Sequence, residues 1–499
     1  MSASASFEKD TRDIVRGTLV NFLGVIARSL NFIFFIILGR FYGSELTGLY
    51  LLSWASVDVF SKLAIMGLDR GVLTLAAKHD AADDKTGVYR VIAQSLFIGC
   101  IASVVMIIVV QLLAEPIAIW IYKQPELALP LRIMGFGMLF WMISAILLFS
   151  TRALRIMKYE VLVKSVSEPI VLLGGAILFY YLGLGILGLA LAFLLSTLTG
   201  AILATIVFAR ELPIEKVAEQ FFSKEKRRNL INFSAPIGIY DMLNLLLQRI
   251  DMFMLGYFVP ISMVGIYGIA EEAAFTIKKV RQSFDPIFIP VISAASERGD
   301  MEGAKQQYRQ VSRWILLLDL ALLGIFVLCA ESIMAIFSAE FTVGASTLIL
   351  LSLSIVINGT FGISELFILI KNPMINLFNT IGTILINVLL NINLIPRYGM
   401  AGAALAITIS YIFMNAARLL EVYIMFRLHP FSSYHLKACV ASTIAFALGF
   451  IGQTLIPLAN TYQQIISALI FVVIYISMLA ILKLSPEDKV IFKNAFAKG

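Results

Sequence analysis

The stretch that decides the fold is Leu38–Tyr50, which reads LGRFYGSELTGLY and returns about 217 residues later, at Leu255–Tyr267, as LGYFVPISMVGIY. Leucine, glycine, phenylalanine, glycine and tyrosine coincide between the two copies. A second stretch, GILGLALA at 185–192, returns at nearly the same offset as GMAGAALA at 399–406. Two matches at nearly one offset predict that the chain is built from an internal repeat.

The segments around these copies are apolar and long enough to cross a membrane. Hydrophobic residues make up 60% of the chain and charged residues 14%, with a mean hydropathy of +0.90, whereas a soluble domain is roughly 45–50% apolar and about 25% charged. A membrane-spanning helix needs about 20 apolar residues. We predict an all-α integral membrane protein with about 14 transmembrane helices. They are expected at 16–39, 44–68, 89–113, 127–150, 161–182, 184–209, 232–258, 261–283, 313–337, 344–370, 373–395, 398–427, 436–458 and 462–484.

The repeat and the helix count together predict two lobes. Six predicted helices separate each copy from its echo, and an even number of crossings returns the chain to the same side of the membrane, so the repeats are parallel. We expect an N-terminal six-helix lobe at 1–210, a cytoplasmic loop between the lobes at 211–231 and a C-terminal six-helix lobe at 232–430. Two extra helices and a cytoplasmic tail follow at 431–499.

Basic residues predict the orientation. With a cytoplasmic N-terminus, about 31 of the 39 lysines and arginines lie in cytoplasmic segments, as the positive-inside rule requires. Both termini are then cytoplasmic. Topology also explains the net charge of +7, so we expect no nucleic-acid partner. The first apolar run is too long for a signal peptide and has no cleavage site, and we expect it to be a retained helix.

Motifs of enzymes and metal sites are missing from the sequence. Cys100, Cys329 and Cys439 are scattered within apolar runs and form neither a disulfide framework nor a metal spacing. The sequence contains no H-E-x-x-H motif, no P-loop and no Ser–His–Asp arrangement. We therefore expect no enzyme activity, no cofactor and no metal ion.

Three motifs resemble one family. They are Gly17-x-x-x-Asn21-Phe22-Leu23-Gly24, the stretch 38–50 already quoted, and NINLIPRYGMAGAA at 391–404. In this order and spacing they resemble the polysaccharide-transport flippases, which move lipid-linked oligosaccharides such as O-antigen and exopolysaccharide repeat units. Those flippases belong to the multidrug, oligosaccharidyl-lipid and polysaccharide exporter superfamily, and the resemblance extends over almost the entire chain.

The resemblance implies a substrate, a location and partners. The substrate would be a polyprenyl-diphosphate-linked oligosaccharide, flipped from the inner to the outer leaflet of the cell inner membrane during polysaccharide or lipopolysaccharide biosynthesis. Membrane lipids, a polysaccharide polymerase and glycosyltransferases would be its partners. Three alternatives stay open: an ion-coupled multidrug exporter of the same superfamily, a membrane enzyme of polysaccharide assembly, and a scaffold without transport.

Charged residues inside the predicted helices are candidates for the site, because a charge near the bilayer centre usually faces protein or a hydrated cavity. In the first lobe these are Arg28, Asp58 and Lys62. Two interpretations stay open. The three side chains form a closed network that fixes packing, or they leave one net positive charge that binds a diphosphate.

The second lobe contributes Arg249 and Asp251, which lie two positions apart and cannot share one helix face. Arg249 is either a second cationic contact for the substrate or a structural partner of Asp241 or of a carboxylate on the helix 261–283. Glu271 and Glu272 on that helix are either a coupling-ion site or a partner for Arg249 and a water-facing acid.

Further polar and aromatic side chains are weaker candidates. Glu365, Asp319 and Glu168 lie nearer the inner helix ends, and Glu365 is kept as an ion-coupling candidate together with Asp58 and Asp251. Arg418 and Glu421 are three apart and are expected to pair. Tyr50 and Trp54 are placed to stack on sugars, although tyrosine and tryptophan are as common in interfacial belts.

Overall fold

The computed structural model describes residues 30–223, 227–298, 301–455 and 460–482, and this part of the chain is helical without any β-strand. Eleven helices in it are long and apolar enough to cross a membrane. Two of them, Leu30–Ala81 with 52 residues and Pro373–Phe426 with 54, have the length of two crossings each. The all-α membrane fold is thus confirmed, while the count of fourteen crossings stays a prediction.

The described chain divides into two compact units, one up to Gly265 and one from Ile266. Unit 1 begins with the helical residues 30–37. Its further elements are η1 (Leu38–Tyr42), α2 (Gly43–Ile65), α3 (Leu68–Ala81), α4 (Lys85–Pro116), η2 (Ile117–Ile121), η3 (Pro125–Leu127), α5 (Ala128–Ala153), α6 (Lys158–Glu160), η4 (Val161–Ser167), α7 (Glu168–Tyr181), α8 (Gly185–Glu211), α9 (Ile214–Glu219) and α10 (Arg227–Phe258).

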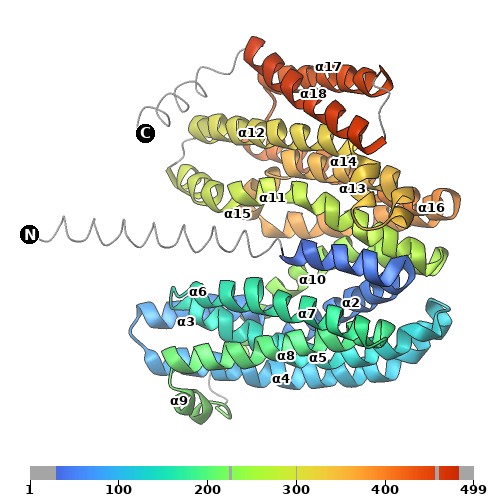
Figure 1. Ribbon diagram of the computed structural model, residues 1–499. Coiled ribbons are helices and arrows are strands. Elements are labelled where there is room, and N and C mark those ends of the chain that lie inside the picture. The colour runs from blue at the N-terminus through green and yellow to red at the C-terminus, as the bar shows by residue number, and fades with distance from the viewer. Residues whose placement is uncertain (1–29, 224–226, 299–300, 456–459, 483–499) are drawn as a thin grey trace, which may run out of the picture. The chain divides into compact units, whose positions relative to one another are not determined.

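Helix α5 is the centre of unit 1. It packs against α2, α3, α4 and α8, and Figure 1 shows α4, α5 and α8 side by side. Buried aliphatic side chains such as Ile65, Ile92 and Ile146 form one contiguous core between these helices. Helix α10, which the sequence analysis assigns to the second lobe, packs on α2 and α3 of unit 1. The predicted lobe boundaries stay a prediction.

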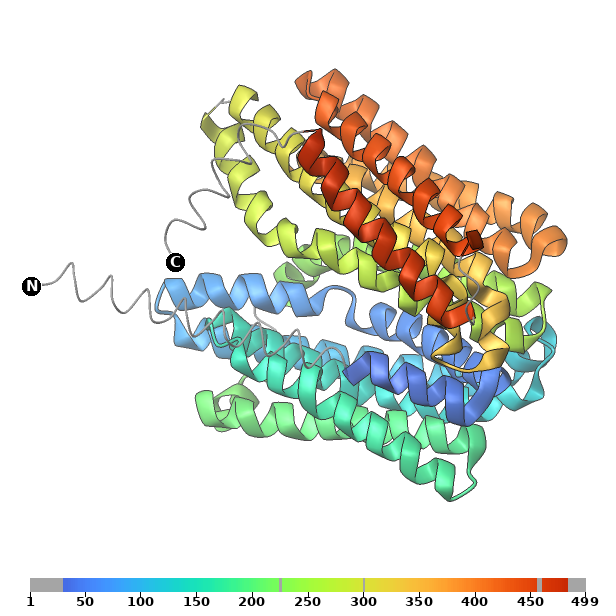
Figure 2. The ribbon, with the colours of Figure 1, turned by 45° about the horizontal axis from the view of Figure 1, so that its top comes forward.

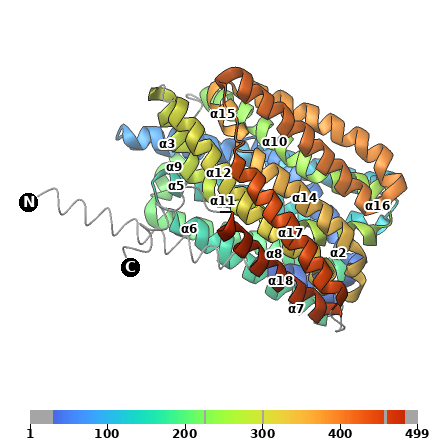
Figure 3. The same ribbon diagram turned by 90° about the horizontal axis from the view of Figure 1, so that it is seen from above.

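Unit 2 contains most of α11 (Ile261–Arg298) and all elements after it. They are α12 (Met301–Leu328), α13 (Ala330–Ala335), η5 (Ala339–Gly344), α14 (Ala345–Phe361), α15 (Ser364–Lys371), α16 (Pro373–Phe426), α17 (Ser433–Leu455) and α18 (Asn460–Ile481). Helix α14 packs on α12 and α16, and the pair α17 and α18 packs on α12 (Figures 2 and 3). The ring of Phe471 lies over Gly324, which anchors this pair to α12.

The second repeated glycine motif has the same backbone role in both copies. Gly185 has a φ of 50° and Gly399 a φ of 55°, a region that residues with a side chain rarely adopt. Gly399 breaks the 54-residue α16 into two helical segments, as the predicted helices 373–395 and 398–427 require. Three residues later, Gly188 and Gly402 each pack closely on the preceding segment, at Phe179 and Leu394.

One helix was not among the predicted segments. Helix α3 follows α2 after Gly67, which has a φ of 75°, and lies in a stretch that the sequence analysis treats as a cytoplasmic loop. Its buried face contains Leu68 and Val72, and its charged residues include Asp69 and Arg70. Such an amphipathic helix has too low an overall hydropathy to be recognised as a membrane span.

Candidate functional site

The candidate site lies on one face of α2. Tyr50, Trp54, Asp58 and Lys62 follow each other at intervals of four residues, and positions four apart lie one above the other on a helix. Tyr50 is 3% exposed and its ring packs edge-on against Phe34 at 5.5 Å, whereas the other three side chains are half-buried. Along this face, a buried aromatic side chain at one end is therefore followed by charged side chains that are accessible at the other.

Close contacts at glycine place α10 against this face. A Cβ on Gly238 would lie 2.3 Å from the carbonyl carbon of Met66, so only glycine allows the two backbones to approach this closely. Nearer the other end of both helices, Gly256 lies against Leu52. The contacts run in opposite directions along the two helices, so α10 is antiparallel to α2.

This alignment brings Arg249 of α10 opposite Asp58 of α2. The Arg249 guanidinium donates to the Asp58 carboxylate at 3.3 Å, and the side chains are 11% and 21% exposed. The same guanidinium lies 4.2 Å from the ring centroid of Trp54, within the range of a cation–π interaction. An arginine held by a carboxylate and a flat ring is oriented before any ligand arrives.

Lys62 forms a second cationic group with side chains from α3, α5 and η4. Its ammonium lies 3.7 Å from Asp69 and 5.8 Å from the ring centroid of Trp141. Lys164 lies 5.7 Å from the same ring and donates to Glu168 at 2.6 Å. Trp141 thus contacts two lysines, and each lysine also has a carboxylate partner.

These pairs bear on the interpretations that the sequence left open. Asp58 pairs with Arg249 and Lys62 with Asp69; Arg28 lies outside the described residues, so the closed network of Arg28, Asp58 and Lys62 stays untested. Of the alternatives for Arg249, the pairing with Asp241 is not formed. Asp241 pairs with Arg70 of α3 at 3.1 Å, because α3 fills the space that the sequence analysis left to a loop.

The remaining candidates on α10 and α11 are largely buried. Asp251 is 3% exposed and Glu271 is 9% exposed, while its neighbour Glu272 is half-buried. The repeat offset aligns Tyr50 with Tyr267 and Trp54 with Glu271. The tyrosine is therefore the same in both copies, whereas the aromatic ring four residues later is replaced by a carboxylate in the second copy. At the same offset Lys62 aligns with Lys279, so one basic position is repeated, while Asp58 aligns with Phe275.

Glu365 is the centre of a separate cluster in unit 2. Arg281 of α11 and Arg418 of α16 approach its carboxylate at 3.4 and 3.3 Å. The expected pair of Arg418 with Glu421 is therefore wrong, and Glu421 accepts a hydrogen bond from Asn379 at 2.7 Å. The carboxylate that pairs with Arg418 comes from another helix, α15, and the spacing of charges along α16 does not reveal this contact.

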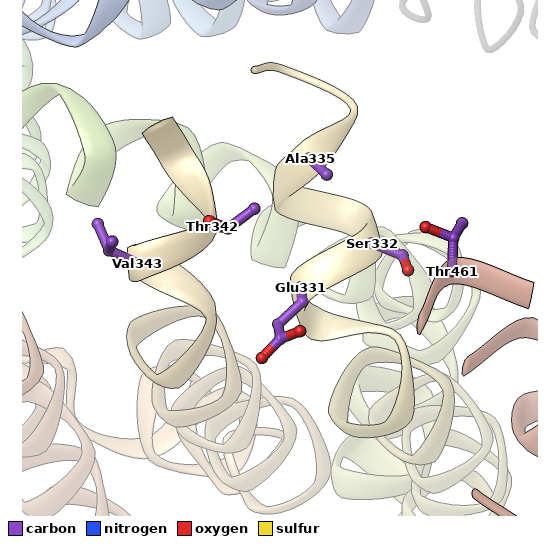
Figure 4. Close-up of a pocket in the computed structure, with 6 residues that line it drawn as sticks. All are labelled: Glu331, Ser332, Ala335, Thr342, Val343 and Thr461. Carbon is purple, nitrogen blue, oxygen red and sulfur yellow. The ribbon is translucent and has the colours of Figure 1, made fainter. Parts of the chain in front are cut away.

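A small pocket of about 350 Å³ lies in unit 2 among α13, η5 and α18. Figure 4 shows that Glu331 and Ser332 line it together with Thr342, Val343 and Thr461. Gln464 accepts hydrogen bonds from the backbone N–H and the hydroxyl of Ser332 and donates to Glu331. No sequence pattern predicts this pocket, because its polar groups come from three separate elements.

Sequence reasoning missed several residues of these clusters. Lys164 and Arg281 lie in the predicted helix ends, where topology alone explains basic residues. Their signal is the carboxylate four residues later, Glu168 and Asp285. Among the described residues, no group of three or more histidine, cysteine, aspartate and glutamate side chains could hold a metal ion.

Solved structures show the fold that holds these clusters. The lipid II flippase MurJ in its inward closed conformation matches with a TM-score of 0.78 at 15% identity, over 93% of this chain and 98% of that one. An inward-facing multidrug resistance MATE family transporter of the MOP superfamily matches with a TM-score of 0.65 at 15% identity, over 80% and 94%. A MOP superfamily transporter from Pyrococcus furiosus matches with a TM-score of 0.58 at 20% identity, over 83% and 95%.

A sequence relative supports the same family. The chain is 22% identical over 277 residues to the "Probable low-salt glycan biosynthesis flippase Agl15" of Haloferax volcanii, and the match covers 54% of this chain and 58% of that protein. The chain thus matches less than two thirds of the length of this curated relative. The family model described as polysaccharide biosynthesis protein matches residues 14–296, more than half of the 499 residues. This chain is a multi-pass membrane protein that belongs to the polysaccharide biosynthesis protein family.

Proposed function

We propose that this chain is a flippase that moves polyprenyl-diphosphate-linked oligosaccharides from the inner to the outer leaflet of the cytoplasmic membrane. The names of its relatives support this proposal, since Agl15 and MurJ are both called flippases. The chain acts as a transporter by alternating access, in which the two lobes of the repeat expose the substrate to each side in turn, and not as an enzyme. Its expected partners are membrane lipids, a polysaccharide polymerase and glycosyltransferases.

The observation that carries the proposal is the group of cations and flat rings in unit 1. An ionised head group in bare hydrocarbon costs tens of kcal/mol, so a flippase must supply polar contacts along the path. Arg249 and Lys62 supply donors for a diphosphate, while Trp54 and Trp141 supply faces on which sugars stack. The polyprenyl tail can stay in the lipid.

The carboxylate partners of these cations give the site a way to release its substrate. Asp58 lies between two cations, because Arg249 is bound to it and Lys62 is close enough to act on it electrostatically. A diphosphate that binds Arg249 displaces Asp58, which turns to Lys62 one helical turn away. When the substrate leaves, the original pair forms again, so the arginine is never left unpaired.

The experiment that tests this function is flipping in proteoliposomes. The purified protein is reconstituted with a polyprenyl-diphosphate-linked oligosaccharide, and the fraction exposed on the outer face is measured by a glycosidase that cannot cross the bilayer. We expect Arg249→Ala and Lys62→Ala each to slow flipping by about tenfold, since a charge-assisted hydrogen bond contributes about 1.5–3 kcal/mol. Arg249→Lys should rescue partly, because it restores the charge but not the planar fork.

The alternative is a multidrug exporter, because the MATE transporter shares the fold over 80% of this chain. The same liposomes distinguish the two functions when a lipophilic cationic drug replaces the lipid-linked oligosaccharide. Drug transport that requires Asp58 and Glu365, together with no flipping of the oligosaccharide, would refute the flippase proposal. Flipping without drug transport supports it.

A further inference from the structure

Asp319 on α12 is a buried carboxyl group without a hydrogen-bond partner among the described residues. The residue is 1% exposed, and in this part of the chain neither of its two carboxylate oxygens meets a donor within hydrogen-bonding distance. It lies within the candidate membrane span Glu302–Leu328. Buried polar groups are nearly always hydrogen-bonded, so an exception of this kind calls for an explanation.

The space for this carboxyl group comes from a glycine on the neighbouring helix. A Cβ on Gly359 of α14 would lie 2.7 Å from one oxygen of Asp319. The Asp319 carboxyl group therefore occupies space that the side chain of any residue other than glycine at position 359 would fill. Helix α14 itself contains no ionisable residue. An ionised carboxylate in this position would lose its hydration without gaining a hydrogen bond, which favours the neutral acid.

Among the described residues, the other elements packed against α12 supply no cation that acts on Asp319, and Lys437 of α17 donates to the carbonyl of Leu482. Helix α17 contributes His435, whose ring contacts Ser312 two turns away. Helix α18 contributes Tyr475, whose hydroxyl donates to the carbonyl of Leu317. Helix α13 contributes Glu331, twelve residues further along the chain. The charged group that acts electrostatically on Asp319 is Arg281 of α11.

Arg281 is engaged elsewhere in this conformation. It donates to the carbonyl of Asn358 at 3.2 Å and lies 3.4 Å from Glu365 and 3.6 Å from Asp285. Arg418 is the second cation on Glu365. Two guanidinium groups and two carboxylates thus balance each other in this cluster. An ionised Asp319 would add one uncompensated negative charge to it.

We propose that Asp319 is a proton-binding site of unit 2, which holds a proton as a neutral carboxylic acid while Arg281 is bound to Glu365. When Arg281 turns from Glu365 to Asp319, the O–H bond of the acid breaks, the proton passes to water and the carboxylate pairs with the guanidinium. No electron is transferred. Glu365 keeps Arg418 as its partner in both states. Asp285 loses Arg281 in the second state, and its side chain is 31% exposed, so water can solvate the carboxylate that is left.

Proton binding at Asp319 is independent of the transported substrate, while its role in driving transport rests on the proposed function. The first experiment therefore needs no substrate. Infrared difference spectra of the full-length protein in lipid are recorded while the pH is raised. We expect the C=O stretching band of a protonated carboxyl group to disappear at alkaline pH in the wild type and to be absent throughout in Asp319→Asn.

Two variants make this experiment decisive. The control Asp285→Asn removes a carboxylate of the same cluster and should keep the band, and Asp319→Glu should keep it at a shifted frequency. A band unchanged in Asp319→Asn would refute the proposal. Loss of the wild-type band on addition of sodium at constant pH would also refute it, in favour of a metal-cation site.

Transport then separates this inference from the proposed function. In proteoliposomes with an imposed pH gradient, we expect wild-type flipping to respond to the gradient and Asp319→Asn to flip at a rate that no longer depends on it. A response retained in Asp319→Asn would overturn the coupling role. Absence of any flipping in the wild type, with the titratable band present, would refute the flippase proposal and leave the proton site intact.

Discussion

Gly48 and Gly265, which occupy the same position in the two copies of the repeated stretch, lie directly against each other. A Cβ on Gly48 would come within 2.1 Å of the carbonyl oxygen of Ile261, and a Cβ on Gly265 within 2.1 Å of the carbonyl oxygen of Ser44. The first turn of α11 and the first turns of α2 thus meet backbone to backbone. The two glycines are repeated because each provides the space that the other copy needs.

Alanine at either glycine should destabilise the protein. Carbonyl oxygens cannot move without shifting a whole helix, and overpacking of this kind costs about 1–3 kcal/mol. We expect Gly48→Ala and Gly265→Ala each to lower the thermal unfolding midpoint in detergent. The control is Gly174→Ala in α7, where a Cβ meets nothing within 4 Å and alanine should raise the midpoint slightly. Equal midpoints in all three variants would contradict the close contact.

The Arg249–Asp58 pair predicts a non-additive double mutant. Because the pair is largely but not wholly buried, removing one partner should cost about 1–3 kcal/mol, between the values for exposed and for fully buried pairs. We expect Arg249→Gln and Asp58→Asn each to reduce stability, and the double variant to be more stable than the sum of the two effects predicts. Unfolding midpoints of the four proteins measure this coupling. Strict additivity would show that the two side chains do not interact.

Substitution of Trp141 should slow transport without unfolding the protein. Its ring lies near Lys62 and Lys164, and a cation–π contact contributes about 0.5–2 kcal/mol. Trp141→Leu should therefore slow flipping several-fold, and Trp141→Phe should slow it less. Trp120→Leu is the control, because Trp120 is 78% exposed and should not affect the rate. A rate that is unchanged in Trp141→Leu would remove this ring from the site.

Asp84 predicts an acid-sensitive helix start. Its carboxylate accepts a hydrogen bond of 2.8 Å from the backbone N–H of Gly87 at the beginning of α4. This hydrogen bond is the main cause that lowers the pKa of Asp84 below its ordinary value of 3.8, and His79 contributes to the same effect. Since the folded pKa lies below the unfolded value, the stabilisation is complete above pH 3.8 and is lost as the pH falls through the folded pKa.

The measurement for Asp84 is the thermal unfolding midpoint at a series of pH values between about pH 6 and pH 3. The midpoint of Asp84→Asn should decrease less with acidification than that of the wild type. The control Glu126→Gln removes an acidic residue at the start of η3, whose N-cap makes no side-chain hydrogen bond, and should follow the wild type. Parallel curves for Asp84→Asn and the wild type would show that this cap does not contribute.

The predicted orientation is tested by fusions. With both termini cytoplasmic, alkaline phosphatase fused after Glu340 should be active, because the enzyme folds only outside the cytoplasm. The same enzyme fused after Lys226 should be inactive. The opposite pattern would reverse the topology that basic residues predict.

The all-helical membrane fold and the kink in α16 could be predicted because each depends on residues close together in the sequence. An apolar run of about 20 residues must be helical in a membrane, since no water satisfies its backbone. Gly399 could be placed at a helix boundary because only glycine adopts a positive φ at low cost. Helix α3 could not be predicted because its polar face lowers its mean hydropathy. Its residues Asp69 and Arg70 nevertheless pair with Lys62 of α2 and Asp241 of α10.

The sequence by itself determined an all-helical membrane protein, its repeat and the small set of charged residues that such a protein can use. Only the tertiary structure decided which of these charges pair, because Arg249 and Asp58 are 191 residues apart and meet through glycine contacts that align two helices. It also decided that Asp319 accepts no hydrogen bond from the residues that the structure describes. A charge in a low-dielectric interior interacts strongly with whatever group is near it, and nearness there is set by helix packing rather than by spacing along the chain.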